Sequence, residues 1–274
     1  MAADLHCHTR ASDGSDTAGE VVLMAKLRGL SAVAVTDHDT FAGVEEAIRF
    51  GTRYGIRVIP GAEFSSTDAA TGRKAHVLCY ACKNPQSIDA LCSATCEARR
   101  KAGEAMLEKV TALYPIPAEM VLDRARGSAS LYKQHIMRAL IDAGYAHEMF
   151  GTVFHELFSK GGKAYVRVEY PEVHDVIEQI HRAGGLAVLA HPGEYDSYDL
   201  LGSLASSRLI DGVEVWHPRN KEGDEQRFSQ IARENGLILT GGTDFHGMHS
   251  KVPLPIGTCT APDSEVMRLF TKTT

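Results

Sequence analysis

The chain contains no apolar run of the roughly 18 or more residues that a membrane-spanning helix needs. It has no excess of basic residues either. The 29 Lys and Arg stand against 35 Asp and Glu, and the formal net charge of −6 disfavours binding to long nucleic acids. The first residues lack the basic and apolar segments of a secretory signal. We therefore expect a cytoplasmic protein with neither a membrane nor a long nucleic acid as partner, and the oligomeric state stays open.

Cysteine is too sparse, at six residues, to suggest a disulfide framework in a chain of 274 residues. Because a cytoplasmic compartment is reducing, we expect free thiols. Cys79-x2-Cys82 and Cys92-x3-Cys96 raise the hypothesis of a structural zinc site. The gap between the two pairs is short for a zinc ribbon, however, and the second pair lies in a helical pattern. Small core residues are therefore the preferred interpretation.

Strand-like and helix-like segments alternate along most of the chain. This order predicts parallel strands, right-handed crossovers and a barrel-like α/β fold. Thr17 with Glu20 predicts a capping box at the start of the first helix. The predicted strands are Asp4–His8, Ser31–Asp37, Ile56–Glu63, Lys74–Ala81, Leu186–His191, Asp211–Trp216 and Leu237–Asp244. The predicted helices between them are Ala18–Arg28, Phe41–Tyr54, Pro171–Ala183 and Glu222–Asn235.

Residues 84–162 interrupt this alternation, because they contain no convincing strand. Their pattern predicts four helices, at Ile88–Leu113, Pro117–Arg126, Leu131–Asp142 and His147–Phe158. A segment of this length is too long for a loop, so it predicts a lid or cap subdomain between the fourth and fifth strands. The barrel domain would then comprise residues 1–83 and 163–274, and the helical insertion residues 84–162.

The 13 histidines are numerous for this length, and many stand with acidic residues at strand ends. His6 and His8 are two residues apart, so both face one side of their strand and Cys7 the other. Strand ends converge at the mouth of a parallel barrel, where active sites form. Clustered imidazoles and carboxylates are costly to bury unless something coordinates them. The pattern therefore predicts a polynuclear metal site, since these groups are ligands for Zn, Mn and Fe.

These motifs resemble the PHP (polymerase and histidinol phosphatase) family. The resemblance is carried by His6-Cys7-His8, Ser12-Asp13-Gly14, Thr36-Asp37-His38-Asp39, Gly61-Ala62-Glu63, His76, Ala190-His191-Pro192 and Thr243-Asp244-Phe245-His246. It implies a distorted (β/α)7 barrel with a trinuclear metal site. The family contains phosphoesterases and the exonuclease domains of bacterial DNA polymerases.

The resemblance also implies roles for individual residues. His6, His8, Glu63 and Asp244 would hold a first metal ion; Glu63, His76 and His191 a second; Asp13, His38 and His246 a third. Mn²⁺ is the expected metal, with Fe or Zn as alternatives. The expected reaction is attack of a metal-bound hydroxide on phosphorus, because clustered cations neutralise an anionic ester and acidify water. Asp13 and His191 are counted as catalytic residues as well as ligands.

The helical insertion of related stand-alone phosphatases suggests substrate-binding residues here. They are Arg99 and Arg100 in the long helix, and Lys133, His135 and Arg138 in the later segment. Lys133 stands where the family pattern has arginine, which removes a bidentate contact to phosphate. A solvated helix face is the alternative for Arg99 and Arg100. His217 is a candidate general acid for the leaving group, or a hydrogen-bond donor behind the reacting groups.

We expect a metal-dependent phosphoesterase acting on a small phosphorylated metabolite. A nucleoside 3′,5′-bisphosphate or a short oligonucleotide end is preferred. The alternatives are a cyclic or linear sugar phosphate such as a ribose phosphate, and histidinol phosphate. Hypotheses of other classes are an amidohydrolase-type enzyme, a non-catalytic accessory PHP module, and an exonuclease on long chains. The order of the motifs and the acidic balance weigh against these.

Overall fold

A computed structural model describes residues 2–271; Met1 and residues 272–274, at the ends of the predicted barrel domain, lie outside the described residues. One eight-stranded sheet runs in the order β7-β6-β5-β4-β3-β2-β1-β8. It nearly closes on itself, because Leu5 N donates to Gly241 O at 3.1 Å and Cys7 forms a bridge with Phe245. The predicted distorted α/β barrel is thereby confirmed. The strands are β1 (Ala2–Asp4), β2 (Ala32–Val35), β3 (Arg57–Thr67), β4 (Lys74–Tyr80), β5 (Leu186–Leu189), β6 (Gly212–Trp216), β7 (Ile238–Gly241) and β8 (Ala261–Pro262).

Strand β4 corrects the prediction of an all-parallel barrel. It runs antiparallel to both β3 and β5, and β8 runs antiparallel to β1. Only residues 68–73 join β3 to β4, too short a connection for a parallel crossover, so the two strands form a hairpin. His76 accordingly lies near the start of its strand rather than at its end. The reversed direction still brings it to the rim where the parallel strands finish.

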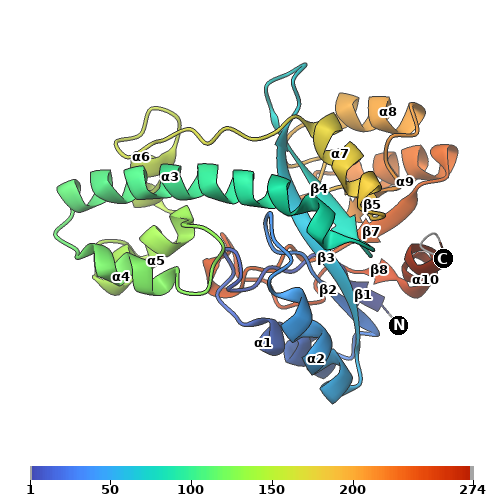
Figure 1. Cartoon of the computed structure of the whole chain (residues 1–274), viewed down its shortest axis with the longest axis horizontal. Helices are drawn as coiled ribbons and strands as arrows, with labels where there is room; N and C mark the ends of the chain where they lie inside the picture. Colours follow the sequence, from blue (N-terminus) through green and yellow to red (C-terminus); the bar gives the residue numbers. More distant parts are fainter. Residues whose placement is uncertain (1, 272–274) are drawn as a thin grey trace.

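The outer helices pack around the sheet (Figure 1). Thr17 and Glu20 form the predicted capping box at the start of the first of them, and Gly55 and Gly236 end two others in the left-handed conformation. Among the six outer helices, α8 and α10 were not predicted, and neither was the two-residue strand β8. The six are α1 (Ala18–Leu27), α2 (Val44–Tyr54), α7 (Val173–Arg182), α8 (Tyr198–Ser206), α9 (Asp224–Asn235) and α10 (Asp263–Thr271).

Between β4 and α7, over residues 81–172, the structure has helices and no strand, and the predicted division into barrel and insertion stays a prediction. A short 3-10 turn, η1 (Pro85–Ile88), precedes α3 (Asp89–Leu113), α4 (Ala118–Arg124), α5 (Lys133–Asp142) and α6 (Thr152–Phe158). We call residues 84–162 the cap; Figure 1 shows its helices extending to one side of the barrel. Met106, Ile136, Leu140 and Phe158 belong to a core cluster of their own there. No helix within residues 2–271 is both long and apolar enough to cross a membrane.

Candidate metal centre

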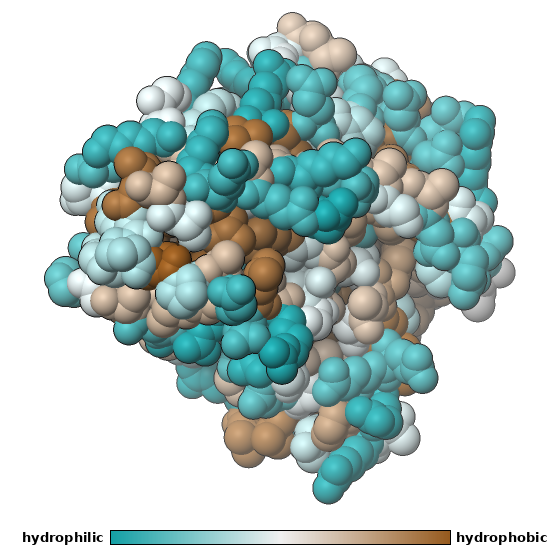
Figure 2. Space-filling view, turned by 60° about the vertical axis from the view of Figure 1, so that its left-hand side comes forward, coloured by the Kyte–Doolittle hydropathy of each residue, from teal (hydrophilic) through white to brown (hydrophobic). Residues whose placement is uncertain are grey.

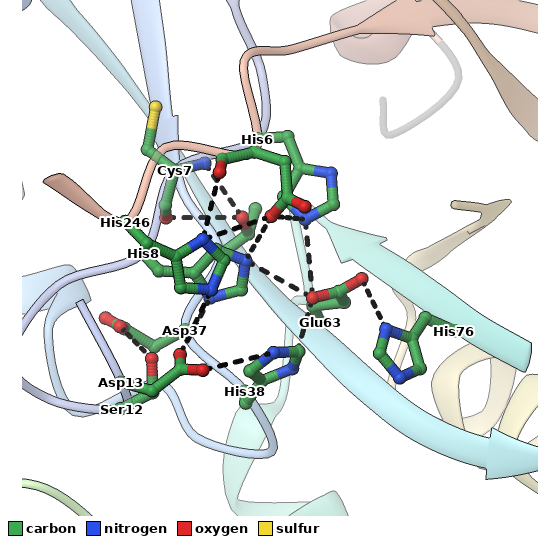
Figure 3. A network of polar contacts seen from close by, with 12 residues as sticks. His6, Cys7, His8, Ser12, Asp13, Asp37, His38, Glu63, His76 and His246 are labelled. Carbon is green, nitrogen blue, oxygen red and sulfur yellow. Dashed lines mark hydrogen bonds and ion pairs between the residues drawn. The ribbon is translucent and has the colours of Figure 1, made fainter. Parts of the chain in front are cut away.

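The nine predicted ligands come from every part of the barrel and meet at one rim. His6, His8, His38, His191, Asp244 and His246 follow β1, β2, β5 and β7; Glu63 and His76 lie within β3 and β4; Asp13 lies on the loop before α1. Figure 3 shows the imidazoles of His6, His8 and His246 turned towards the carboxylates, whereas the Cys7 thiol points away. All nine are buried except His38, which is partly so.

A first group consists of His6, His8, Glu63 and Asp244. The Nε2 atoms of His6 and His8 lie 3.3 and 3.2 Å from Glu63 Oε2. The same two nitrogens lie 3.5 and 3.2 Å from Asp244 Oδ1. Two imidazole nitrogens and two carboxylate oxygens thus face a common point, a donor set that suits a divalent metal ion.

Glu63 extends this group in two directions. Its Oε1 lies 2.9 Å from His76 Nδ1 and 2.8 Å from His191 Nε2, whereas its Oε2 also lies 3.1 Å from His38 Nδ1. Burial opposes ionisation of this carboxyl, but the imidazoles of His76, His6 and His38 outweigh it and hold the pKa well below its usual range. Glu63 is therefore a charged side chain at the centre of the cluster, with one oxygen on each side.

A further group consists of His8, Asp13, His38 and His246. His246 Nε2 lies 3.2 Å from Asp13 Oδ1, and His38 Nε2 lies 3.9 Å from Asp13 Oδ2. His8 and His246 stack with their ring centroids 4.1 Å apart. His8 is shared with the first group, so the groups form one continuous cluster.

Unpaired buried atoms test whether metal ions fit this cluster. Burying a polar atom without a partner costs about 1–3 kcal/mol. The atoms without a hydrogen-bond partner among the described residues include His6 Nε2, both ring nitrogens of His8, Asp13 Oδ1, His38 Nδ1 and His191 Nδ1. These six atoms belong to predicted ligands, whereas three further such atoms, Asp39 Oδ2, His217 Nε2 and Asn220 Oδ1, do not. Lone pairs left free on six ligand atoms are what metal ions require. The residues present therefore fit divalent metal ions.

Two buried carboxylates outside the nine hold the ligands in place. Glu214 of β6 accepts from the backbone N–H of His191 at 2.8 Å and lies 2.9 Å from His6 Nδ1, which leaves His6 Nε2 free for the cluster. Asp37 accepts from Thr9 N, Thr9 Oγ1 and Ser12 Oγ at 2.6–2.7 Å and so fixes the loop that carries Asp13. Glu214 was missed because nothing in the sequence distinguishes it from a surface residue of a strand.

The cluster forms one end of a cavity of about 1040 Å³ between the barrel and the cap. The cap contributes both apolar and polar side chains to this cavity, and the apolar ones are Met106, Leu131, Phe150 and Phe154. Figure 2 shows apolar surface inside the hollow on that side of the molecule. The basic side chains that line the cavity are Lys74, Arg99, Lys133, Lys160, Arg167, Arg219 and Lys251. A small anion with an apolar part matches these walls.

The structure brings only two of the five predicted substrate residues to the cavity, Arg99 and Lys133. Arg100 faces solvent and pairs with Glu97 and Glu104 on its own helix. Arg138 pairs with Asp142, its Nη2 2.6 Å from Oδ1, on a face that does not line the cavity.

His135 is buried and accepts from Tyr132 N at 3.2 Å, also away from the cavity. His217 is likewise buried and absent from the cavity lining; its Nε2 lies 3.5 Å from Asp244 Oδ2. His217 thus lies behind Asp244, but its Nε2 has no hydrogen-bond partner among the described residues, so both of its predicted roles stay predictions.

Several cavity residues carried no motif and were not predicted. Gln134 Nε2 donates to Asp13 Oδ2 at 2.7 Å. Arg219 lies against Asp244 and places its Nη1 2.6 Å from Glu194 Oε1. Two further groups could hold a metal ion, one of His38, Glu63 and His76 and one of His191, Glu194 and Asp244. Beside the second, the Arg219 guanidinium already provides a positive charge. The only sequence signal for Glu194 and Arg219 was that polar residues follow β5 and β6, where the strands end.

Known proteins agree with this fold and site. The family model "PHP domain" matches residues 4–235, and the chain belongs to the PHP family. It is 39% identical to a phosphoribosyl 1,2-cyclic phosphate 1,2-diphosphodiesterase of Eggerthella lenta, over 92% of this chain and 97% of that one. It is 30% identical to a 5′-3′ exoribonuclease of Haemophilus influenzae, over 89% of each. It is also 30% identical to a 3′,5′-nucleoside bisphosphate phosphatase of Chromobacterium violaceum, over 89% of each.

A solved structure supports the same assignment. A proposed metal-dependent phosphoesterase from Bifidobacterium adolescentis superposes with a TM-score of 0.90 at 30% identity, over 98% of this chain and 96% of that one. Together with the buried cluster of imidazoles and carboxylates, these relationships identify the protein as a metal-dependent hydrolase of phosphoester bonds.

Proposed function

We propose that the protein hydrolyses a phosphoester of a small ribose derivative that carries two phosphoryl groups, with a nucleoside 3′,5′-bisphosphate or a short oligonucleotide end preferred. The observation that carries this is the cavity itself, which joins the metal centre to Lys133. One phosphoryl group would lie at the metal centre and the other at Lys133. A nucleoside 3′,5′-bisphosphate satisfies this description, and so does a cyclic ribose phosphate that carries a further phosphate.

Lys133 supports an anion subsite because its charge is not balanced. Within residues 2–271 its ammonium has no carboxylate partner; it donates to Phe158 O at 3.4 Å and lies over the rings of Phe158 and Tyr165. Burial lowers the pKa of Lys133 to about 8, and the charge of Lys74 contributes to this. A partly buried cation gains most from an anionic ligand, which restores its lost solvation.

The apolar wall favours a nucleotide over a bare sugar phosphate. Phe150, Phe154, Val166 and Val168 line the cavity together with Tyr165. A planar base would bury apolar surface there, at roughly 25 cal/mol per Å², whereas a ribose phosphate has nothing to place against it. The relative from C. violaceum is named for a substrate of this kind.

A cyclic ribose phosphate is the second candidate. The relative at 39% identity, matched over 97% of its length, is named for a phosphoribosyl 1,2-cyclic phosphate. Such a compound also has two phosphoryl groups, so Lys133 would serve it equally. The presence or absence of a base separates the two candidates.

We infer three divalent ions, Mn²⁺ first with Fe or Zn as alternatives, held by the nine residues as assigned from the resemblance. Such ions would neutralise the ester and acidify water. The side chains of the protein would contribute the remaining catalytic groups and the contacts that position the substrate. Asp13 and His191, both facing the cavity beside the cluster, are the proposed catalytic residues. Arg219, which pairs with Asp244 and Glu194, would hold these two carboxylates at the cavity, and Lys133 would fix the far end of the substrate.

The proposed partners are small phosphorylated substrates, and six free thiols support a reducing compartment such as the cytoplasm. The test uses the Mn-loaded protein and follows release of inorganic phosphate from the monoesters and ring opening of the cyclic esters by phosphorus NMR, since opening a cyclic diester yields a monoester and no free phosphate. Matched pairs would be used: nucleoside 3′,5′-bisphosphate against 3′-monophosphate, and ribose 1,2-cyclic phosphate with and without a 5-phosphate. Each pair would be repeated with Lys133→Met.

We expect loss of the second phosphoryl group to lower kcat/KM by about tenfold or more in the wild type, as for a charge-assisted contact, and much less in the variant. Equal turnover of both members of each pair by the wild type would contradict the proposal. Preference for the nucleotide pair or for the cyclic pair decides between the two candidates.

A further inference from the structure

The cap reaches the metal centre at one corner, through Gln134 and Asp13. Gln134 Nε2 donates to Asp13 Oδ2 at 2.7 Å. The other oxygen, Asp13 Oδ1, has no hydrogen-bond partner and lies 3.2 Å from His246 Nε2. The amide of Gln134 therefore fixes which carboxylate oxygen of Asp13 is directed into the cluster.

The segment that precedes α5 also forms hydrogen bonds with the loop that carries Asp13. Ala129 N donates to Ala11 O at 2.9 Å, and Ser128 Oγ donates to Ser12 O at 2.5 Å. These contacts hold the backbone immediately before Asp13 against the cap. The position of this carboxylate is thus fixed from the cap through both its side chain and its loop.

On the other side of the same corner, Arg99 of α3 holds the turn that carries His38. Its Nη1 lies 2.8 Å from Asp39 Oδ2, and its Nη2 donates to Ser65 Oγ at 2.7 Å. Asp39 has a left-handed backbone (φ 55°), a conformation that persists in a non-glycine residue only where the surroundings hold it. Arg99 is buried, and its charge is already neutralised by Asp39. It is therefore suited to holding this turn rather than to binding a substrate phosphate.

Tyr132 completes the contact between cap and turn. Its hydroxyl lies 3.0 Å from Arg99 Nη1 and donates to His38 O at 3.3 Å, and its ring stacks near the His38 imidazole. By contrast, no hydrogen bond runs, within residues 2–271, from the cap to the remaining ligands outside this corner. These are His6, His8, Glu63, His76, His191 and Asp244, which are held by barrel residues such as Glu214.

We propose that the cap is the positioning element for one metal position only, the corner formed by Asp13, His38 and His246. Gln134 sets the affinity of that position. Arg99 contributes through the turn at Asp39, whose backbone N–H also donates to Glu63 O at 2.8 Å. This inference rests on the proposed set of three ions. Partners that orient a ligand from behind are typically worth about 10–100-fold in metal affinity.

The experiment measures the metal itself rather than turnover. Chelator-treated protein is titrated with Mn²⁺ against a fluorescent competitor, and the bound metal is counted by mass spectrometry. Gln134→Leu is compared with Gln230→Leu, an exposed glutamine of α9 that bonds only within its helix. Arg99→Met is compared with Lys101→Met, an exposed lysine of the same helix as Arg99.

We expect wild type and both controls to hold three equivalents. Gln134→Leu should hold two with unchanged affinity and the third about 10–100-fold more weakly, and Arg99→Met should likewise weaken the third. Excess Mn²⁺ should restore the third equivalent, because the ligands themselves remain. Circular dichroism and thermal melting check the fold; should Arg99→Met fail to fold, Gln134→Leu carries the test alone.

The inference is overturned if Gln134→Leu keeps three equivalents at wild-type affinity, or if all three positions weaken together. A wild type that holds three ions yet hydrolyses none of these phosphoesters would overturn the proposed function and leave this inference standing. A wild type that holds fewer than three ions would overturn both this inference and the proposed metal set.

Discussion

His76 Nδ1 lies 2.9 Å from Glu63 Oε1 across the antiparallel pair of β3 and β4. The two residues are diagonal neighbours on one face of the hairpin, since Ser65 is paired with His76 and Glu63 with Leu78. Reversal of a single strand thus places an imidazole from the start of β4 beside a carboxylate in the middle of β3. Glu63 becomes the residue through which the parts of the cluster are joined.

Replacement of Glu63 by glutamine should therefore damage the whole centre. The variant loses the charge that faces His6, His8, His38, His76 and His191. We expect kcat to fall by at least about 10³-fold and at least one metal equivalent to be lost, as for a group that holds catalytic metal. Kinetics and metal content are measured together, with the exposed Glu222→Gln as control. Substantial turnover without loss of metal would contradict the central place of Glu63.

Lys133 should impose a pH limit on substrates with two phosphoryl groups. Burial lowers its pKa to about 8, so the amine is charged below that pH and loses its charge as the pH rises through it. We expect kcat/KM for a bisphosphate to fall above about pH 8, because this parameter reports the free enzyme. Lys133→Arg should extend activity to higher pH, and Lys133→Met should remove the dependence. A matched monophosphate with the same fall above pH 8 would assign the titration to another group.

Arg138 should prove unimportant for catalysis, contrary to its predicted role in substrate binding. Its guanidinium pairs with Asp142 and does not line the cavity. We expect Arg138→Ala to leave kcat and KM within about twofold and to lower stability by at most about 0.5 kcal/mol, as for a helical ion pair near the surface. Steady-state kinetics and denaturant unfolding give both quantities. A KM raised tenfold would show that the cap rearranges to bring Arg138 to the substrate.

Replacement of His217 should lower kcat by a similar factor for all substrates. It lies behind Asp244 rather than at the cavity, so it has no direct route to a leaving group. We expect His217→Gln to lower kcat by a similar factor across esters whose leaving groups differ in pKa, with the slope against that pKa unchanged. If the loss is instead concentrated in esters with poor leaving groups, His217 is the general acid and its ring must reach the cavity during turnover.

The sequence predicted the site correctly where residues able to bind a metal ion stand at the end of a predicted strand. His6, His191 and Asp244 could be placed together because strand ends of a barrel converge on one rim. Glu63 was expected at the end of its strand, but β3 continues to Thr67. The direction of β4 could not be predicted, since a strand has the same pattern in either direction. The turn at residues 68–73, with its Gly72, was the only sign of a hairpin.

The cap was harder to predict, because helical periodicity identifies an apolar face but not the element that it packs against. His135 and Arg138 share a face of α5, yet neither points to the cavity, whereas their neighbours Lys133 and Gln134 do. Gln134 and Arg219 belong to no motif, and their roles come from tertiary contacts alone. The identity of site residues in the cap therefore required the structure.

Activity as a function of bound Mn²⁺ tests the central claim most directly. Chelator-treated protein is mixed with a nucleoside 3′,5′-bisphosphate, Mn²⁺ is returned stepwise, and phosphate release is followed beside the metal content. The account predicts no turnover without metal and full turnover only when the last of three equivalents is bound. Undiminished phosphate release by metal-free protein, or full activity at a single equivalent, would contradict it.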